Sequence, residues 1–303
     1  MAFKYSVSGI TLGFLGYDFT EEPEFILKSI KDAGFDGIDV FDNPNKRNAE
    51  QIRQIVDSLS LKVPEVLGNW GGDSRDLAGG DGDTRKKAVE YAKEVIDYCV
   101  NLNSSVFGLC LPQPSVTEAP ISIMPVNTLK RNLVDGLKEI CAYAAERKVT
   151  VVIEPLNCYE SYPCLMNTLK ETMNVIKELD CDNIGLQPDV FHMNIGETSI
   201  TDAIKTFKDD IVTFHMNETN HFKFGSGHAD VKAIMKTLKT IGFSGYMTIY
   251  MPLMTRKLFN MSFRGIVDEG TSPAKPDLNA VLTETIEYIR SVEAEIEEEK
   301  VSR

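Results

Sequence analysis

The feature that most limits the fold of this chain is a regular alternation between short β-rich runs and longer amphipathic segments, repeated about eight times. The β-rich runs cover 5–9, 37–41, 62–66, 105–109, 149–154, 183–187, 211–215 and 246–251. The amphipathic segments cover 22–33, 48–60, 84–101, 126–147, 167–179, 199–207, 230–241 and 279–298. Because such alternation is typical of parallel strands joined by crossover helices, it predicts an α/β protein.

The number of repeats separates two parallel-sheet architectures. Eight βα units in about 250 residues match a (β/α)8 TIM barrel, whose active site lies at the carboxyl ends of its strands. A doubly wound sheet is the alternative, but no G-x-G-x-x-G follows the first strand. We predict a single TIM-barrel domain over residues 1–303. The barrel covers about 5–255, and an irregular stretch over 253–278 precedes the final helix.

Residues at the predicted helix ends support this division. Gly34 and Gly242 each stand between an amphipathic segment and the next β-rich run, where a left-handed cap is expected. Thr84 and Asp230 stand where helix N-caps are expected.

Composition limits the partners and the compartment. The chain is 43% apolar and 25% charged, which suits a globular protein with a large core. It shows no signal-peptide pattern, no run of about 20 apolar residues and no C-x-x-C pair among six cysteines. A net charge of −13 argues against nucleic acid as a partner. We expect a cytoplasmic protein that binds neither nucleic acid nor membrane.

Strand periodicity predicts that polar side chains from four consecutive strands converge. Side chains alternate across a strand, and apolar residues suit the face that packs against the helices. The opposite face then carries Glu154, Asp189, His215 and Tyr250 near the strand ends. We expect these four side chains to meet at the mouth of the barrel.

The chemistry of these side chains suits a metal site. All four histidines, His192, His215, His221 and His228, fall within the segment 192–228, which favours a functional cluster. Two carboxylates and an imidazole can hold Mn²⁺, Co²⁺, Mg²⁺ or Zn²⁺. The alternative is that the carboxylates cap helices or pair with lysine, and the spacing leaves both open. His228 fits a structural role better.

Four motifs resemble one family. They are I-E-P-L-N-C-Y-E (153–160), P-D-V-F-H-M-N-I (188–195), H-M-N-E-T-N-H (215–221) and G-S-G-H-A-D (225–230). They are similar to the xylose-isomerase-like barrels, and most similar to the ketose 3-epimerase branch that acts on D-tagatose and D-psicose. The architecture matches over about 5–250, whereas the motifs concentrate in 150–250.

This resemblance implies roles for particular residues. Glu154, Asp189 and His215 match three ligands of one divalent metal, and Tyr250 replaces the fourth ligand, a glutamate. Glu160 and His192 match substrate-contacting residues. An arginine that usually follows the metal-binding histidine by six residues is replaced by His221, which we expect to contact substrate.

The replacement at position 250 affects the expected mechanism. In the resembled enzymes two glutamates remove and return a proton next to a ketose carbonyl, while the metal stabilises an enediolate. Tyr250, with an ordinary pKa near 10, is a poor base at neutral pH. Three outcomes stay open: Glu154 acts alone, Tyr250 acts as a general acid, or the protein binds a sugar without converting it.

Trp70 lies in the glycine-rich loop 68–83. It offers a flat face for a sugar ring, or it anchors the loop, and both readings are open. We assign no role to Asp39.

The resulting hypothesis is a metal-dependent sugar isomerase or epimerase with Glu154 and Tyr250 as catalytic residues. The alternative is a sugar-binding or catalytically altered homologue. A phosphodiesterase related to endonuclease IV is disfavoured, because a multi-zinc site needs more histidines and the net charge repels nucleic acid. The resemblance also implies a dimer or a tetramer.

Overall fold

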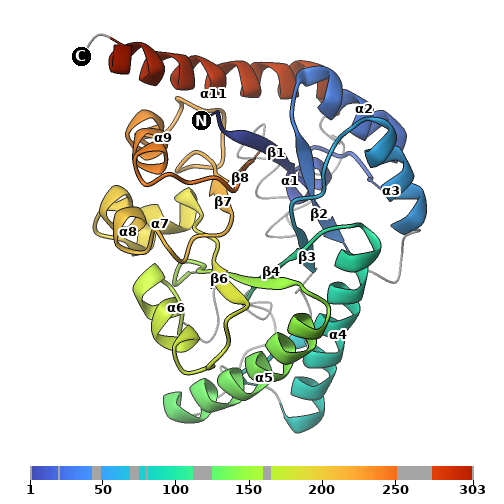
Figure 1. Ribbon diagram of the computed structural model, residues 1–303, viewed down its shortest axis with the longest axis vertical. Helices are drawn as coiled ribbons and strands as arrows, with labels where there is room; N and C mark the ends of the chain where they lie inside the picture. Colours follow the sequence, from blue (N-terminus) through green and yellow to red (C-terminus); the bar gives the residue numbers. More distant parts are fainter. Residues whose placement is uncertain are drawn as a thin grey trace, which may run out of the picture.

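Eight parallel strands follow one another around a barrel, and helices surround them (Figure 1). The structure is a computed structural model that describes residues 2–19, 21–42, 49–68, 75–79, 81–111, 125–159, 165–250 and 275–301. The strands are β1 (Lys4–Ser8), β2 (Gly37–Asp42), β3 (Val66–Gly68), β4 (Val106–Cys110), β5 (Thr150–Glu154), β6 (Ile184–Leu186), β7 (Phe214–Met216) and β8 (Tyr246–Ile249). The prediction of a TIM barrel is confirmed.

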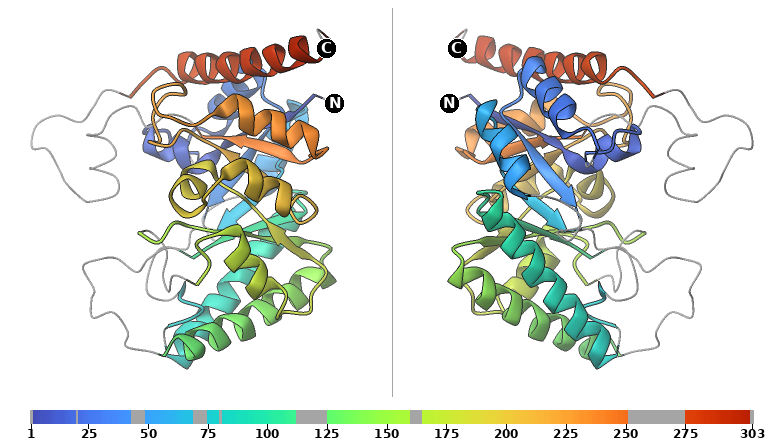
Figure 2. Two further views of the ribbon diagram at one scale, coloured as in Figure 1. Left: turned by 90° about the vertical axis from the view of Figure 1, so that its left-hand side faces the viewer. Right: turned by 90° about the vertical axis from the view of Figure 1, so that its right-hand side faces the viewer.

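Ten helices belong to the described residues, and eight of them form the outer ring. The ring helices are α2 (Pro23–Ala33), α3 (Ala49–Ser58), α4 (Gly82–Asn101), α5 (Val126–Glu146), α6 (Leu169–Ile176), α8 (Ile200–Thr206), α9 (Val231–Thr240) and α11 (Leu278–Val301). α11 packs against both α2 and α9 and so completes the ring next to β1 (Figure 2). No described helix is long and apolar enough to cross a bilayer.

Two short helices, α1 (Gly9–Phe14) and α7 (Val190–Gly196), were not predicted. α1 begins directly after β1, α7 is separated from the end of β6 by three residues, and both lie inside the connection to the next ring helix. They are too short to show a helical period in the sequence. Of the two, α7 carries His192, a residue of the predicted site.

Neighbouring strands of the barrel pair in two ways. β1 pairs with both β2 and β8 in continuous parallel ladders. β6 and β7 instead meet through two isolated bridges, Leu186 with Ile211 and Asp189 with His215. The second bridge puts two of the predicted site residues side by side.

The predicted third and seventh strands start too early. The segment 62–65 runs beside β2, and the carbonyls of Lys62 and Glu65 accept hydrogen bonds from Ile38 and Val40. Pro64 has no N–H to donate, which fits a regular ladder that begins only at Val66. In the seventh run only the bridge at Ile211 precedes the strand, which begins at Phe214.

The predicted helix ends are mostly confirmed. Gly34 and Gly242 have positive φ angles of 92° and 74°. Asp230 caps α9 by accepting a hydrogen bond from the N–H of Ala233 at 2.9 Å. The prediction for Thr84 is wrong: Asp81 is the N-cap of α4, and its carboxylate accepts the N–H of Thr84 at 2.7 Å.

Two predicted irregular segments are described only in part. Residues 69–74 and 80 of the glycine-rich loop 68–83, and residues 253–274 of the stretch 253–278, are not among the described residues.

Candidate active site at the carboxyl ends of the strands

His215 is the centre of the polar cluster at the barrel mouth. It lies in the middle of β7 and is fully buried. Its Nδ1 atom lies 3.1 Å from Oε1 of Glu154 and 3.8 Å from Oδ2 of Asp189. The structure therefore brings these three predicted ligands together, and strand alternation accounts for it.

Asp189 accepts hydrogen bonds from two neighbours at the start of α7. One of its oxygens accepts the backbone N–H of His192 at 3.2 Å, which makes Asp189 the N-cap of this helix. The other oxygen accepts the side-chain amide of Asn217 at 2.8 Å. The Asn217 carbonyl oxygen in turn accepts the N–H of Phe191 at 2.8 Å. These bonds fix the carboxylate with Oδ2 toward His215.

Tyr250 reaches the same point from β8. Its hydroxyl lies 3.3 Å from Nδ1 of His215, and its backbone N–H donates to the carbonyl of Met216. The phenol of Tyr250 thus approaches His215 from the β8 side, whereas Glu154 and Asp189 approach it from the side of β5 and β6. The structure brings all four predicted side chains to one place.

His192 lies next to this cluster in a defined tautomer. The backbone N–H of Asn157 points at its Nδ1 atom at 3.2 Å. A backbone N–H can only donate, so Nδ1 accepts and the proton of the neutral ring sits on Nε2. His192 is 8% exposed and can offer this Nε2–H as a hydrogen-bond donor.

His221 forms an aromatic wall with two neighbours. Its ring centroid lies 3.8 Å from that of Phe191 and 6.0 Å from that of Tyr250. The backbone at His221 is left-handed, with φ of 56°. The wall therefore depends on the conformation of the loop after β7.

Glu218 holds that loop. Its buried carboxylate accepts the N–H groups of Thr219 at 2.8 Å, Gly225 at 3.0 Å and Ala229 at 3.0 Å. Burial alone would raise the pKa of Glu218, but these donors lower it. His228 is exposed and hydrogen-bonds to Thr219 at the outer end of the loop, away from His215.

Two predicted substrate contacts cannot be placed. Trp70 and Glu160 lie outside the described residues. Their roles stay predictions.

Burial and neighbouring charges set the protonation of the cluster. Burial, and then the charge of Glu154, raise the pKa of Asp189 to about 7. Burial alone would also raise the pKa of Glu154, but the charge of His215 and its hydrogen bond lower it. Burial opposes the charged form of His215, yet Glu154 raises the pKa of this imidazole well above its ordinary value. Glu154 is therefore the ionised carboxylate of the pair.

The tyrosine and the outer histidines stay neutral. Burial, and then the charges of Glu154 and Asp189, raise the pKa of Tyr250 well above its ordinary value. Burial lowers the pKa of His192 to about 4 and that of His221 to about 3. Tyr250 can donate a hydrogen bond at neutral pH, and the two imidazoles carry no charge.

The donor set suits a divalent cation. Two buried carboxylates need a nearby positive charge. Their oxygens, with the His215 nitrogen, form the mixed oxygen and nitrogen set that Mn²⁺, Co²⁺, Mg²⁺ and Zn²⁺ accept. Donor atoms of Glu154, Asp189 and His192 lie within 4.8 Å of one another, but the proton on Nε2 of His192 makes His215 the better nitrogen ligand.

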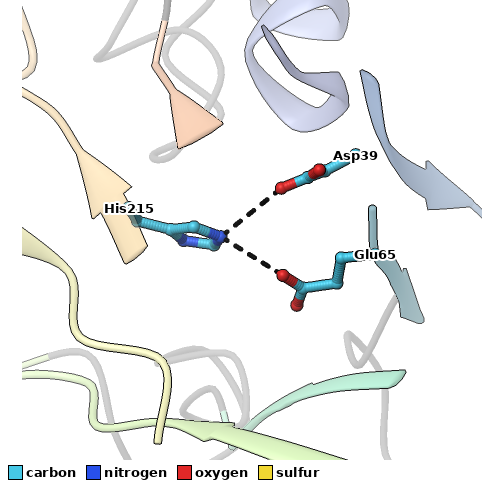
Figure 3. A group of neighbouring side chains, drawn as sticks. All are labelled: Asp39, Glu65 and His215. Carbon is cyan, nitrogen blue, oxygen red and sulfur yellow. Dashed lines mark ion pairs between the residues drawn. The ribbon is translucent and has the colours of Figure 1, made fainter. Parts of the chain in front are cut away.

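A second acidic group faces the other side of His215. Asp39 and Glu65 are fully buried and lie near its Nε2 atom (Figure 3). The sequence patterns assign no role to Asp39, and they point to neither Glu65 nor Asn217. Glu65 precedes β3, whose ladder begins at Val66, so it does not stand at the carboxyl end of a strand, where polar side chains indicate a site. Asn217 stands in the 215–221 motif, and its spacing from His215 was the available signal.

The family of the chain follows from this fold and a direct match. A family model described as "Xylose isomerase-like TIM barrel" matches residues 27–287. This is well over half of the chain, and the protein belongs to that family.

Similar proteins of this family are named as sugar epimerases. A 3-dehydro-D-guloside 4-epimerase of Escherichia coli (strain K12) is 26% identical over 235 residues, covering 74% of this chain and 86% of that protein. A D-psicose 3-epimerase of Ruminiclostridium cellulolyticum is 25% identical over 239 residues, covering 78% and 80%. A solved structure of an L-ribulose 3-epimerase superposes with a TM-score of 0.82 at 20% identity, covering 99% and 97% of the two chains.

Proposed function

We propose that this protein is a sugar isomerase or epimerase that moves a proton next to the carbonyl of a ketose or a modified monosaccharide. The observation that carries the proposal is the meeting of Glu154, Asp189, His215 and Tyr250 around Nδ1 of His215. The names of the similar proteins supply the reaction class, since they are 3-epimerases and a 4-epimerase. The 4-epimerase widens the proposed substrates from free ketoses to keto-glycosides.

Each group has a distinct task in this proposal. Glu154, Asp189 and His215 would hold a divalent metal of the Mn²⁺, Co²⁺, Mg²⁺ or Zn²⁺ kind. Such an ion stabilises negative charge that develops on the sugar oxygens. Glu154 is ionised, takes the proton from the carbon next to the carbonyl and, as the carboxylic acid so formed, returns a proton to the substrate carbon. Tyr250 stays protonated, so its hydroxyl donates a hydrogen bond where a second glutamate would have accepted a proton.

The surroundings bind and orient the substrate. His192 offers its Nε2–H to a sugar hydroxyl, because Asn157 occupies Nδ1. His221 and Phe191 offer a neutral aromatic face to the apolar side of the sugar ring. Glu160 and Trp70 remain part of the proposal through the resemblance.

Exchange of hydrogen with the solvent tests the proposal. Purified protein is incubated in D₂O with Mn²⁺ and a panel of ketoses and 3-keto-glycosides, and deuterium at the carbons next to the carbonyl is measured. We expect incorporation with at least one substrate. Glu154→Gln should slow it by about 10² to 10⁴ fold, the range of a lost general base. Tyr250→Phe should keep measurable exchange.

A negative result would have a defined meaning. Tight binding of a sugar with no exchange in any metal would support the alternative of a sugar-binding homologue. If hydrogen exchange persists in Glu154→Gln and disappears in Tyr250→Phe, Tyr250 and not Glu154 is the general base.

The proposal also covers assembly and compartment. We propose a homo-oligomer, a dimer or a tetramer, on the basis of the resemblance alone, and a cytoplasmic location as expected from the sequence patterns. Sedimentation velocity at micromolar concentration checks the first point, and a monomer would contradict it.

A further inference from the structure

The interior of the barrel beneath the proposed site is polar. A TIM barrel is usually filled by layers of branched apolar side chains. Here one layer, which we call the inner polar layer, consists of Ser6, Asp39, Glu65, Gln187, Thr213 and Thr248, all 3% exposed or less. Nε2 of His215 faces Asp39 and Glu65 of this layer (Figure 3), and its Nδ1 faces Glu154 and Asp189 of the proposed site.

Asp39 and Glu65 are fixed within this layer by donors from other strands. The hydroxyl of Thr248 donates to Oδ2 of Asp39. The side-chain amide of Gln187 donates to Oε2 of Glu65 and, at 2.8 Å, to Thr213. Because Thr248 lies on β8 and Gln187 directly follows β6, the two carboxylates are held by the barrel itself.

Gly108 in β4 makes room for Glu65. A Cβ atom at this position would lie 1.9 Å from Oε1 of Glu65. Any larger residue would push the carboxylate out of the layer. The backbone of β4 is thus shaped around this side chain.

The two carboxylates face one nitrogen of His215. Nε2 lies 3.9 Å from Oδ2 of Asp39 and 3.8 Å from Oε2 of Glu65, and it is fully buried. Among the described residues this nitrogen has no partner at hydrogen-bond distance. A bare lone pair so close to two carboxylates is repelled, whereas an N–H is attracted. Nδ1 also faces carboxylates, Glu154 at 3.1 Å and Asp189 at 3.8 Å, but a cation held by these two needs the Nδ1 lone pair. In the metal-loaded protein the proton of His215 therefore belongs on Nε2.

The position of this proton decides what the other nitrogen can do. A neutral imidazole has one protonated nitrogen and one lone pair. With the proton on Nε2, the lone pair on Nδ1 points between Glu154 and Asp189. We propose that Asp39 and Glu65 are positioning residues that hold His215 in the Nε2–H tautomer and so present Nδ1 to the metal. This inference rests on the proposed function, because the metal must lie on the Nδ1 side.

Metal affinity gives the first measurement. Mn²⁺ and Zn²⁺ are titrated into metal-free wild type, Asp39→Asn, Glu65→Gln and the double variant. We expect each single variant to bind about 10 to 100 fold more weakly, as is usual when a partner of a ligating histidine is lost. Asp36→Asn is the matched control: Asp36 is an exposed carboxylate that accepts the backbone N–H of Tyr5 at 2.8 Å and does not face His215. Its affinity should stay within twofold of wild type.

The ring tautomer gives a second measurement that needs no variant in the inner polar layer. Nitrogen-15 spectra of histidine-labelled wild type loaded with Zn²⁺ report which ring nitrogen carries a proton. The chain has four histidines, so His192→Asn, His221→Asn and His228→Asn identify the His215 signals by elimination. We expect a slowly exchanging proton on Nε2 and none on Nδ1.

Three results would overturn the inference. The first is a proton on Nδ1 of His215 in the loaded protein. The second is metal affinity within twofold of wild type in the folded Asp39 and Glu65 variants. The third is two metal ions per chain, one of which is lost in these variants, since the inner polar layer would then be a cation site itself.

Failure of the proposed function would look different. Wild type that binds no metal would refute both statements. Wild type that binds one metal with the expected tautomer but exchanges no sugar hydrogen would refute the reaction and leave the role of Asp39 and Glu65 standing.

Discussion

Tyr250 sets the charge of the proposed metal site. The site contains two carboxylates, Glu154 and Asp189, and a neutral phenol at the position where the resemblance implies a third carboxylate. The two negative charges of the carboxylates therefore just balance the two positive charges of a divalent ion. Affinity for hard cations rises with the number of charged ligands, so residue 250 should control how tightly the metal is held.

Two substitutions at this position test that statement. Tyr250→Glu adds a charged oxygen beside Nδ1 of His215, and we expect Mn²⁺ to bind about tenfold more tightly or better. Tyr250→Phe removes only a neutral donor, so its affinity should stay within about threefold of wild type. Isothermal titration calorimetry measures both. Weaker binding in Tyr250→Glu would mean that residue 250 does not face the metal.

His221 should make the protein sensitive to acid. Burial lowers its pKa to about 3, so between pH 3 and 6.5 the unfolded chain binds a proton that the folded protein does not. Stability is therefore full above about pH 6.5 and falls as the pH drops toward 3. His221→Phe keeps the stack on Phe191 without this proton.

Urea unfolding of metal-free protein at pH 7 and pH 5 checks this prediction. The His221 side chain is partly exposed, so solvent reduces the effect of its protonation. From pH 7 to pH 5 we expect the free energy of unfolding of wild type to fall by about 1 kcal/mol more than that of His221→Phe. Equal losses in both proteins would show that His221 is protonated equally in the folded and unfolded states.

At the scale of elements, the connection after β7 shapes the aromatic wall. Glu218 accepts three backbone N–H groups from this connection, and bonds of this kind to a charged acceptor are the strong ones. The side-chain amide of a glutamine brings its own donors and no charge. We expect Glu218→Gln to lower the free energy of unfolding by about 2 kcal/mol and to raise KM more than it lowers kcat.

The control for this variant lies in the same region. Lys223 and Glu284 form an ion pair whose side chains are 62% and 61% exposed, so Lys223→Met should leave stability nearly unchanged.

Gly227→Ala should have the same effect as Glu218→Gln, because the Cβ of the alanine would lie 2.3 Å from Oε1 of Glu218. If Gly227→Ala left KM unchanged, the loop would not depend on this carboxylate.

The elements also show what the sequence could predict. The alternation of side chains along a strand is a local property. It was therefore enough to predict, without coordinates, that Glu154, Asp189, His215 and Tyr250 point to the same end of the barrel. The pairing of Asp39 and Glu65 with His215 joins β2, the residue before β3, and β7 across the barrel, and no local pattern contains it. The bonds that Glu218 makes to its loop involve backbone N–H groups, which any sequence supplies.

At the scale of the whole molecule, Glu293 joins the last ring helix to the first strand. Its carboxylate accepts the N–H of Phe3 at 3.2 Å and the hydroxyl of Tyr5 at 2.6 Å. It also pairs with Lys239 of α9 at 2.9 Å. The side chains of Lys239 and Glu293 are 5% and 15% exposed. One carboxylate thus connects α11, β1 and α9 where the ring of helices closes.

The contacts of Glu293 should contribute more to the free energy of unfolding than the surface ion pairs around them. Glu293→Gln leaves a largely buried lysine with a weaker partner and replaces an acceptor of two further hydrogen bonds, so we expect a loss of about 2 to 3 kcal/mol. Glu297, whose side chain is 50% exposed, pairs with the same Lys239, and Glu297→Gln should cost less than about 1 kcal/mol. Thermal unfolding of the two variants beside wild type compares them directly. Because Lys239 is common to both pairs, equal shifts in melting temperature would mean that the lysine charge matters and the bridge from α11 to β1 does not.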